Sequence, residues 1–246
     1  LESYLAELGC DGRQARVRGS RTGTVSILQR TRDGGATWEP IELQSRQLAV
    51  RALAFAPDGT LYGVSSRMLA TGTFPFLIAS DSRGQDWRVR DEQLSAGFAG
   101  TIDRLHVNAR DPRLLIAYGD RDFLRSPDGG STWESLPLSQ VRGGGAGAPD
   151  LAAGGEDGGT YYAVVPNDGG LYRSLDAGRT WTRVLDGVRC MVPGPGRDVY
   201  AGRRGGDRVW RSPDGGDSWQ EAGVVADGLQ VLGLGWDPRG GQRLFA

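Results

Sequence analysis

Short apolar runs alternate with clusters of Gly, Pro, Asp and Ser along the chain, a pattern typical of β-strands joined by tight turns. The clearest stretch predicts strands at 101–107, 114–118 and 122–126, separated by a turn that contains Asp111 and by a short loop. A fourth strand is predicted over 132–136. The pattern therefore predicts an all-β unit of four antiparallel strands.

The same unit is predicted elsewhere in the chain. Its further predicted strands are 50–56, 61–64, 160–165, 170–174, 188–192, 198–201 and 208–212. Residues 65–75 are predicted to form a long loop, and the glycine-rich residues 142–147 a flexible connector. Each end of the chain is predicted to hold the first two strands of a unit, at 8–13 and 15–19 and at 231–238 and 242–246.

An eight-residue motif, Ser/Thr-x-Asp-x-Gly-x-Thr-Trp, recurs once in each predicted unit. Its copies occupy 31–38, 80–87, 126–133, 174–181 and 212–219, and in the second copy Ser82 stands where the others have Asp. The tryptophans that close the copies are 38 to 49 residues apart. Repeats of about 45 residues are typical of four-stranded propeller blades.

The motif resembles the Asp-box, also called the BNR repeat. The resemblance implies a β-propeller in which the box joins the third and fourth strands of each blade. We predict one propeller domain over 1–246, with five full Asp-box blades and the start of a sixth. The blades are predicted at about 1–45, 46–95, 96–140, 141–186 and 187–228, with a partial blade at 229–246. Such a chain fits a fragment of a ring of six or seven blades, and a closed five-bladed ring is the alternative.

The box residues are predicted to be structural. The Asp can accept hydrogen bonds from its own turn, the Gly can supply a positive φ, and the Trp can be buried between sheets. These residues are Asp33, Gly35, Trp38, Trp87, Asp128, Gly130, Trp133, Asp176, Gly178, Trp181, Asp214, Gly216 and Trp219. Copies distributed over separate blades cannot converge on one metal or substrate. The turn with Ser82 is expected to be weaker, and the arginines before four boxes (Arg30, Arg125, Arg173 and Arg211) are expected to be solvated or paired.

Composition narrows the function classes. A formal net charge of −1 gives no electrostatic reason to expect binding to nucleic acid or to an anionic membrane surface. No apolar run approaches the roughly 20 residues that a membrane span needs, and no signal peptide is recognisable. With one histidine, His106, and two cysteines, Cys10 and Cys190, we expect no metal site, no cofactor and no disulfide framework. His106 is predicted to pack on an inner strand and the cysteines to be unpaired.

A binding face is predicted opposite the boxes, where the loops between second and third strands lie. Its candidate residues are Arg67, Met68, Phe74, Phe76, Asp120, Arg121, Asp122, Asn167, Asp168, Arg203, Arg204 and Asp207. The stretch 67–76 mixes apolar with cationic groups, as protein-binding patches do. A plain surface loop is the alternative for that stretch.

Asp-box repeats occur in sialidases, glucanase-type glycoside hydrolases, sortilin-like receptors and photosystem II assembly factors. We predict a non-catalytic binding or assembly scaffold for a protein or glycan partner, with an extracellular or periplasmic location implied by the resemblance. The alternative is a glycoside hydrolase, sialidase- or glucanase-like, with its acids on the loop face. The acids available by position are Asp103, Asp111, Asp120, Glu156 and Asp157, and none has a distinguishing context. The Arg-Ile-Pro motif usual in sialidases is missing.

Overall fold

The computed structural model describes only part of the chain. The described residues are 4–8, 15–19, 21–22, 25–26, 28–31, 33, 35–41, 49–69, 72–82, 84, 86–91, 94, 102–119, 123–136, 150–154, 158–165, 169–225, 229–237 and 243–246. Within these ranges the secondary structure consists of strands and turns, without a helix. None of the described residues therefore forms a helix long and apolar enough to span a membrane. The prediction of an all-β fold is confirmed.

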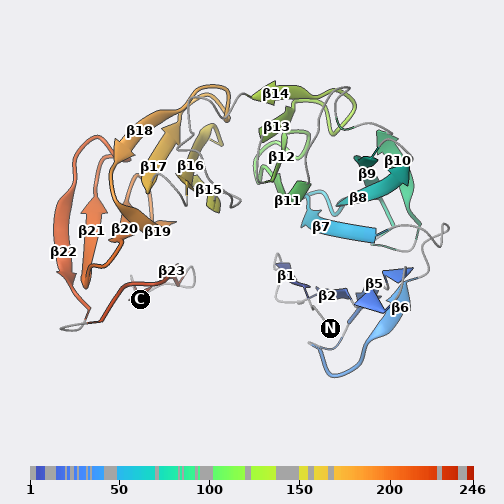
Figure 1. Ribbon diagram of the computed structural model, residues 1–246, viewed down its shortest axis with the longest axis horizontal. Coiled ribbons are helices and arrows are strands. Elements are labelled where there is room, and N and C mark those ends of the chain that lie inside the picture. Colours follow the sequence, from blue (N-terminus) through green and yellow to red (C-terminus); the bar gives the residue numbers. More distant parts are fainter. Residues whose placement is uncertain are drawn as a thin grey trace. The chain divides into compact units, whose positions relative to one another are not determined.

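Four antiparallel sheets each contain four strands in sequence order, as Figure 1 shows. The second blade contains β7 (Ala49–Phe55), β8 (Leu61–Leu69), β9 (Gly72–Ser80) and β10 (Arg88–Asp91). The third contains β11 (Ile102–Val107), β12 (Leu115–Gly119), β13 (Phe123–Ser126) and β14 (Glu134–Leu136). The fourth contains β15 (Asp150–Gly154), β16 (Thr160–Val165), β17 (Gly170–Ser174) and β18 (Thr182–Leu185). The fifth contains β19 (Val188–Pro193), β20 (Val199–Arg203), β21 (Arg208–Ser212) and β22 (Gln220–Val224).

The first blade has the same order, built from shorter pairings. The strand β1 (Tyr4–Leu8) pairs with β2 (Ala15–Gly19), and β5 (Leu28–Arg30) pairs with β6 (Glu39–Ile41). Because β2 lies beside β5, the four strands follow one another as in the other blades. Two short strands, β3 (Arg21–Thr22) and β4 (Val25–Ser26), form a separate hairpin. Near the end of the chain, β23 (Gly235–Trp236) pairs with β24 (Leu244–Phe245), as expected for the start of a further blade.

One predicted loop is wrong. Residues 65–69 and 72–75 belong to the paired strands β8 and β9, whose register continues from Leu61↔Ser80 to Leu69↔Gly72. The polar residues of this stretch suggested a loop, but polar side chains are compatible with a strand when its backbone is paired, and Ser65 is fully buried there. The predicted connector at 142–147 lies outside the described residues.

The chain forms two compact units, Leu1–Ser135 and Leu136–Ala246. In the first unit Val64, Leu77 and Leu115 belong to one buried apolar cluster, so the second and third blades pack through their faces. In the second unit Tyr162 and Met191 belong to a corresponding cluster between the fourth and fifth blades. The blade boundaries within a single domain over 1–246, and the number of blades in a ring, stay predictions.

The two ends of each blade differ in what they carry. At one end the box lies against the turn between the first and second strands, because Gly129 N donates to Arg113 O (2.7 Å). Since the strands are antiparallel, the second-to-third loop and the start of the first strand lie at the other end. There Val188 N donates to Gly169 O (2.6 Å) and joins the fifth blade to the loop of the fourth. We call these the box end and the loop end.

The boxes also contact the preceding blade. The Tyr162 hydroxyl of β16 donates to Gly215 O (2.8 Å) in the box of the fifth blade. A side chain at Gly215 would begin only 3.2 Å from that hydroxyl, and one at Gly129 3.4 Å from the hydroxyl of Tyr62 in β8. The fourth box has Ala177 at the same place, with φ 59°, so the turn itself accommodates a side chain. A side chain at Gly129 would touch the Tyr62 hydroxyl at ordinary contact distance, and one at Gly215 would require the Tyr162 hydroxyl to shift slightly.

Gly130 approaches the preceding blade closely. We expect Gly130→Ala to lower the free energy of unfolding by about 1–3 kcal/mol more than Gly59→Ala. Both glycines have positive φ (87° and 91°), so the backbone strain is shared. A Cβ on Gly130 would lie 2.0 Å from Cδ2 of the buried Leu77, whereas one on Gly59 meets nothing within 4 Å.

Chemical denaturation of the two variants measures this difference. Gly59→Ala is the matched control for strain, and equal losses in the two variants would show that packing against Leu77 does not constrain the box.

Candidate functional site

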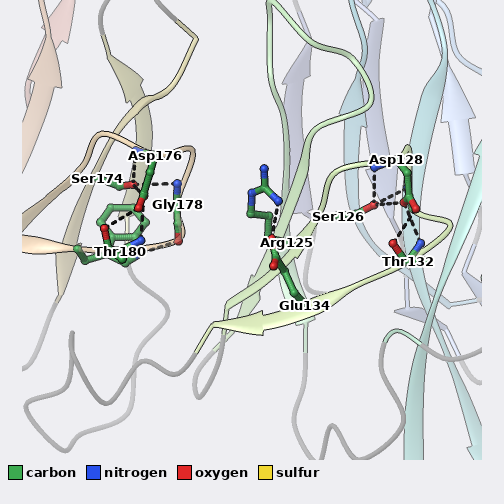
Figure 2. Close-up of polar contacts among 11 residues, drawn as sticks. Arg125, Ser126, Asp128, Thr132, Glu134, Ser174, Asp176, Gly178 and Thr180 are labelled. Carbon is green, nitrogen blue, oxygen red and sulfur yellow. Dashed lines mark hydrogen bonds and ion pairs between the residues drawn. The ribbon is translucent and has the colours of Figure 1, made fainter.

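Each box is a hydrogen-bonded turn centred on a carboxylate. In the third box the Ser126 hydroxyl donates to Asp128 Oδ1 (2.9 Å) and accepts from Gly130 N (2.8 Å). The same Oδ1 accepts from Thr132 N (2.8 Å), and Oδ2 accepts from the Thr132 hydroxyl (2.6 Å). Figure 2 shows this arrangement twice, around Asp128 and around Asp176. Both carboxylate oxygens are therefore engaged within the turn.

The other boxes with an Asp have the same geometry. In the fourth, Thr180 N donates to Asp176 Oδ1 (2.8 Å) and the Thr180 hydroxyl to Oδ2 (2.6 Å). In the first and fifth boxes the backbone donors are Thr37 N to Asp33 Oδ1 (2.9 Å) and Ser218 N to Asp214 Oδ1 (2.8 Å). Four carboxylates thus serve their own turns, which leaves them poorly placed to bind a metal or a substrate.

These hydrogen bonds favour the ionised carboxylates. Those from Thr37, and then from Thr31, hold the pKa of Asp33 well below its ordinary value. For Asp128 burial raises the pKa, but the hydrogen bonds from Thr132 and Ser126 outweigh it, so the pKa is lowered. The carboxylates of Asp33 and Asp128 are therefore ionised throughout the neutral pH range.

The second box keeps its turn without an Asp. Gly84 N donates to the Ser80 hydroxyl (2.8 Å), and Asp86 N donates to the Ser82 hydroxyl (2.7 Å). Ser82 thus replaces one carboxylate oxygen as an acceptor. The second carboxylate oxygen of the other boxes has no counterpart in Ser82. The Thr or Ser that donates to that oxygen in the other boxes is replaced by Asp86. The expectation of a weaker turn at this box remains a prediction.

The five tryptophans are held in two ways. Three of them donate from Nε1 to a glycine carbonyl of their own box: Trp38 to Gly35 (3.1 Å), Trp87 to Gly84 (3.2 Å) and Trp181 to Gly178 (3.0 Å). The Nε1 atoms of Trp133 and Trp219 are buried and have no hydrogen-bond partner in the part of the chain that the structure describes. Trp133 packs against the apolar cluster shared by the second and third blades, and Trp219 packs against the one shared by the fourth and fifth blades.

Three of the four arginines that precede the boxes form ion pairs, each with a different partner. Arg125 pairs with Glu134 across the hairpin, as Figure 2 shows. Arg173 pairs with Asp217 (2.7 Å) in the next box, and Arg211 pairs with Asp198 (2.9 Å). Arg30 lies in β5. Their arrangement is structural, so none of the three paired residues marks a ligand site.

The predicted binding-face residues are placed unevenly. Arg67 and Met68 lie in β8 opposite Phe74 and Thr73. Phe76 is 2% exposed and packs with Leu61, Ile78 and Trp87, so it is core and its placement on an accessible face is corrected. Asp120, Arg121, Asp122, Asn167 and Asp168 lie outside the described residues. Arg203 ends β20, and Arg204 and Asp207 lie in the loop before β21.

The structure brings Arg204 against the loop of the preceding blade. Its backbone N donates to Gly187 O (2.8 Å). A Cβ on Gly169 would lie 3.6 Å from Arg204 Nε, so the side chain of Arg204 packs over this glycine. Two predicted loops, the one after β16 and the one after β20, therefore meet at the loop end of the second unit.

Sequence reasoning missed a recurrent β-bulge at the loop end. The register of the first strand skips one residue in three blades: Arg51 in β7, Asp103 in β11 and Arg189 in β19. A bulge redirects the side chain of the extra residue, and bulges are common beside functional sites. The sequence signal is a charged residue directly after a buried or half-buried apolar residue at the strand start.

The remaining candidates do not form a catalytic set. Asp111 accepts from Arg113 N (3.1 Å) and Nε (3.3 Å) in a turn at the box end. Asp103 lies in β11, whereas Asp120, Glu156 and Asp157 lie outside the described residues. His106 lies on the first strand of its blade, and burial lowers its pKa to about 4, so it is neutral at pH 7. Cys190 is buried and forms no disulfide with a described residue, whereas Cys10 lies outside the described residues.

No protein-family model matches the chain, and no curated protein matches it in sequence. Among solved structures, an ancestral GH74 enzyme matches with a TM-score of 0.59 and 13% identity, over 88% of this chain and 30% of that one. The α-L-arabinofuranosidase Arb93a from Fusarium graminearum, in complex with an iminosugar inhibitor, matches with a TM-score of 0.52 and 14% identity, over 98% and 85%. YCF48 from Cyanidioschyzon merolae matches with a TM-score of 0.53 and 14% identity, over 96% and 91%.

These likenesses show the fold. The three structures are β-propellers, and this chain is a β-propeller of four-stranded antiparallel blades, as predicted. The chain spans less than a third of the GH74 enzyme but most of the other two proteins. At this level of identity the fold does not carry function with it.

The lowered pKa values predict an acid dependence of stability. A carboxylate with a folded-state pKa below its unfolded value stabilises the fold above the unfolded pKa, and this stabilisation is lost as the pH falls towards the folded pKa. For Asp128 the loss is expected below about pH 4, since the ordinary value is 3.8. We expect Asp128→Asn to be less stable than the parent at pH 7 and to lose less stability between pH 5 and pH 2, as urea denaturation would measure. Parallel acid profiles for parent and variant would contradict this role of the carboxylate.

The two kinds of tryptophan give a second prediction. Trp87→Phe removes a buried hydrogen bond to Gly84 O, whereas Trp133→Phe removes a buried donor that lacks a described partner. An unsatisfied buried donor costs about 1–3 kcal/mol, so Trp133→Phe is expected to be the milder change by about 1 kcal/mol. Thermal and chemical unfolding of the two variants would measure the difference. A larger loss for Trp133→Phe would indicate that Nε1 has a partner after all.

Proposed function

We propose that the chain is an Asp-box propeller that acts as a non-catalytic binding or assembly scaffold, with its loop end contacting a protein or glycan partner. One observation carries this proposal. At the loop end of the first strands, exposed arginines lie at or next to the bulges in both units: Arg51 and Arg104 in the first and Arg189 in the second. In each unit, exposed arginines at this end suit the binding of an anionic partner.

Hydrolysis by paired carboxylates has less support. A glycosidase of that kind holds two acids about 5–10 Å apart across the scissile bond. The four described box carboxylates are engaged in their own turns, and Asp111 lies with Arg113 at the box end. Two described acids near the loop end of the second unit lie beside arginines, Asp186 next to Arg183 (2.7 Å) and Asp207 next to Arg208 (3.8 Å).

The structural neighbours are compatible with either role. They include an enzyme of the GH74 type and an arabinofuranosidase, and also YCF48. Since fold alone does not choose, the proposal rests on the charges at the loop end. An exported location, extracellular or periplasmic, is part of the proposal and follows from the Asp-box resemblance.

A substrate panel tests the proposal. We expect no turnover of fluorogenic sialoside, glucoside and arabinofuranoside substrates or of polymeric glucans, because the box carboxylates are engaged in their own turns, and Asp186 and Asp207 lie beside arginines. The assay would follow fluorophore release and reducing ends against an active glycosidase.

One outcome would overturn the scaffold proposal. Turnover that is abolished by Asp103→Asn, with unchanged thermal stability, would make the chain a glycoside hydrolase. The matched control is Asp111→Asn, which changes an acid at the box end and is expected to leave any such activity intact.

A further inference from the structure

We propose that the loop end of the second unit binds an acidic protein segment that also carries apolar side chains. The surface consists of Arg189, Arg203, Arg204, Leu229 and Leu232, and we call it the arginine–leucine corner. This inference rests on the proposed scaffold function and names the chemistry of the partner at one surface.

The backbone places two residues of the corner, Arg189 and Leu232, in equivalent positions of consecutive repeats. Val188 N donates to Gly169 O (2.6 Å), and Val231 N donates to Gly206 O (3.1 Å), so each valine begins a repeat against the loop of the blade before it. Both valines are buried. The next residue is Arg189 in one repeat and Leu232 in the other, and both are exposed.

The second contribution comes from the loop after β20. The Arg203 guanidinium lies 4.3 Å from the centre of the Trp210 ring, which holds it flat by a cation–π contact. Its Nε is buried and has no hydrogen-bond partner within the described ranges. Arg204 is exposed and anchored through its backbone to Gly187. Two guanidinium groups are thus presented by a loop that hydrogen bonds on both sides.

The acids around the corner are used elsewhere. Asp186 pairs with Arg183 (2.7 Å), and Asp207, in the same loop as Arg203 and Arg204, lies beside Arg208 (3.8 Å). In the part of the chain that the structure describes, no ion pair includes Arg189, Arg203 or Arg204. Three positive charges at one end of one blade favour an anionic partner, because its negative charge offsets their mutual repulsion.

The apolar residues favour a protein over a glycan. Leu229 and Leu232 are 64% and 67% exposed, on either side of Val231, which is 3% exposed. A sugar ring would need an open aromatic face, but the ring of Trp210 has Arg203 over it. Arginine and tryptophan next to exposed apolar side chains are typical of protein-binding surfaces. The corner therefore fits a segment with carboxylates and apolar side chains.

The test uses peptides of about 12 residues, roughly 40 Å when extended. A fluorescein-labelled peptide of alternating Glu and Leu is the probe, and fluorescence anisotropy with the full chain measures its dissociation constant. A Gln–Leu peptide and a Glu–Ser peptide separate charge from apolar contact, and heparin serves as an anionic glycan.

We expect the Glu–Leu peptide to bind more tightly than either comparison peptide and its affinity to fall with salt. The double variant Arg189→Glu, Arg204→Glu should weaken binding by about tenfold or more, and Leu232→Ser by several-fold. Arg110→Glu, an exposed arginine at a box-end turn, is the matched control and should change binding by less than about twofold. If the double reversal impairs folding, Arg189→Gln, Arg204→Gln replaces it.

Three results would overturn the proposal: equal affinity for the Gln–Leu peptide, equal binding by the double variant, or binding of labelled heparin without binding of the Glu–Leu peptide. Each of them leaves the scaffold proposal standing, because a partner could bind at another surface. Glycosidic turnover in the substrate panel would instead remove the scaffold proposal, whatever the peptides do.

Discussion

Every blade turns back on itself at a box, where several backbone N–H groups lie beyond the reach of a strand partner. Unsatisfied groups of this kind are costly, so the turn needs acceptors of its own. In the third box the Ser126 hydroxyl and the Asp128 carboxylate supply them, and they are joined to each other by a hydrogen bond. The acidity of the repeat therefore reflects hairpin geometry, and its carboxylates are occupied before any ligand could reach them.

This requirement makes the box end of a blade different from its loop end. At the box end, glycines such as Gly130 bring the backbone so close to the preceding sheet that Leu77 would meet a Cβ at 2.0 Å. That end is committed to packing. The loop end has no such repeat, and there the first strands bulge and present charged residues, including Arg51 and Arg189. The charged residues at the loop end are thus less constrained by packing between blades than the glycines of the boxes.

Much of this architecture could be predicted from the sequence, because alternation, turn residues and a period of about 45 residues are local signals. The strands predicted at 160–165 and 170–174 match β16 and β17. The predicted loop at 65–75 was wrong because its polar residues belong to a paired hairpin. The bulges, the contact of Arg204 with Gly169 and the bond from Tyr162 to Gly215 depend on the spatial neighbour, which residue types alone do not reveal.

The contact between Tyr162 and the next box has an implication for how such a chain can diversify. Tyr62 and Tyr162 are each followed by a box with a glycine at the contact, Gly129 and Gly215, whereas the third blade has Ile116 at the equivalent strand position and the next box has Ala177. The repeats therefore differ at a position where a box contacts the blade before it in the same unit. A recombination that placed an alanine at position 215 would bring a Cβ to 3.2 Å from the Tyr162 hydroxyl, so repeats taken from different places would fit only after a small shift of the tyrosine.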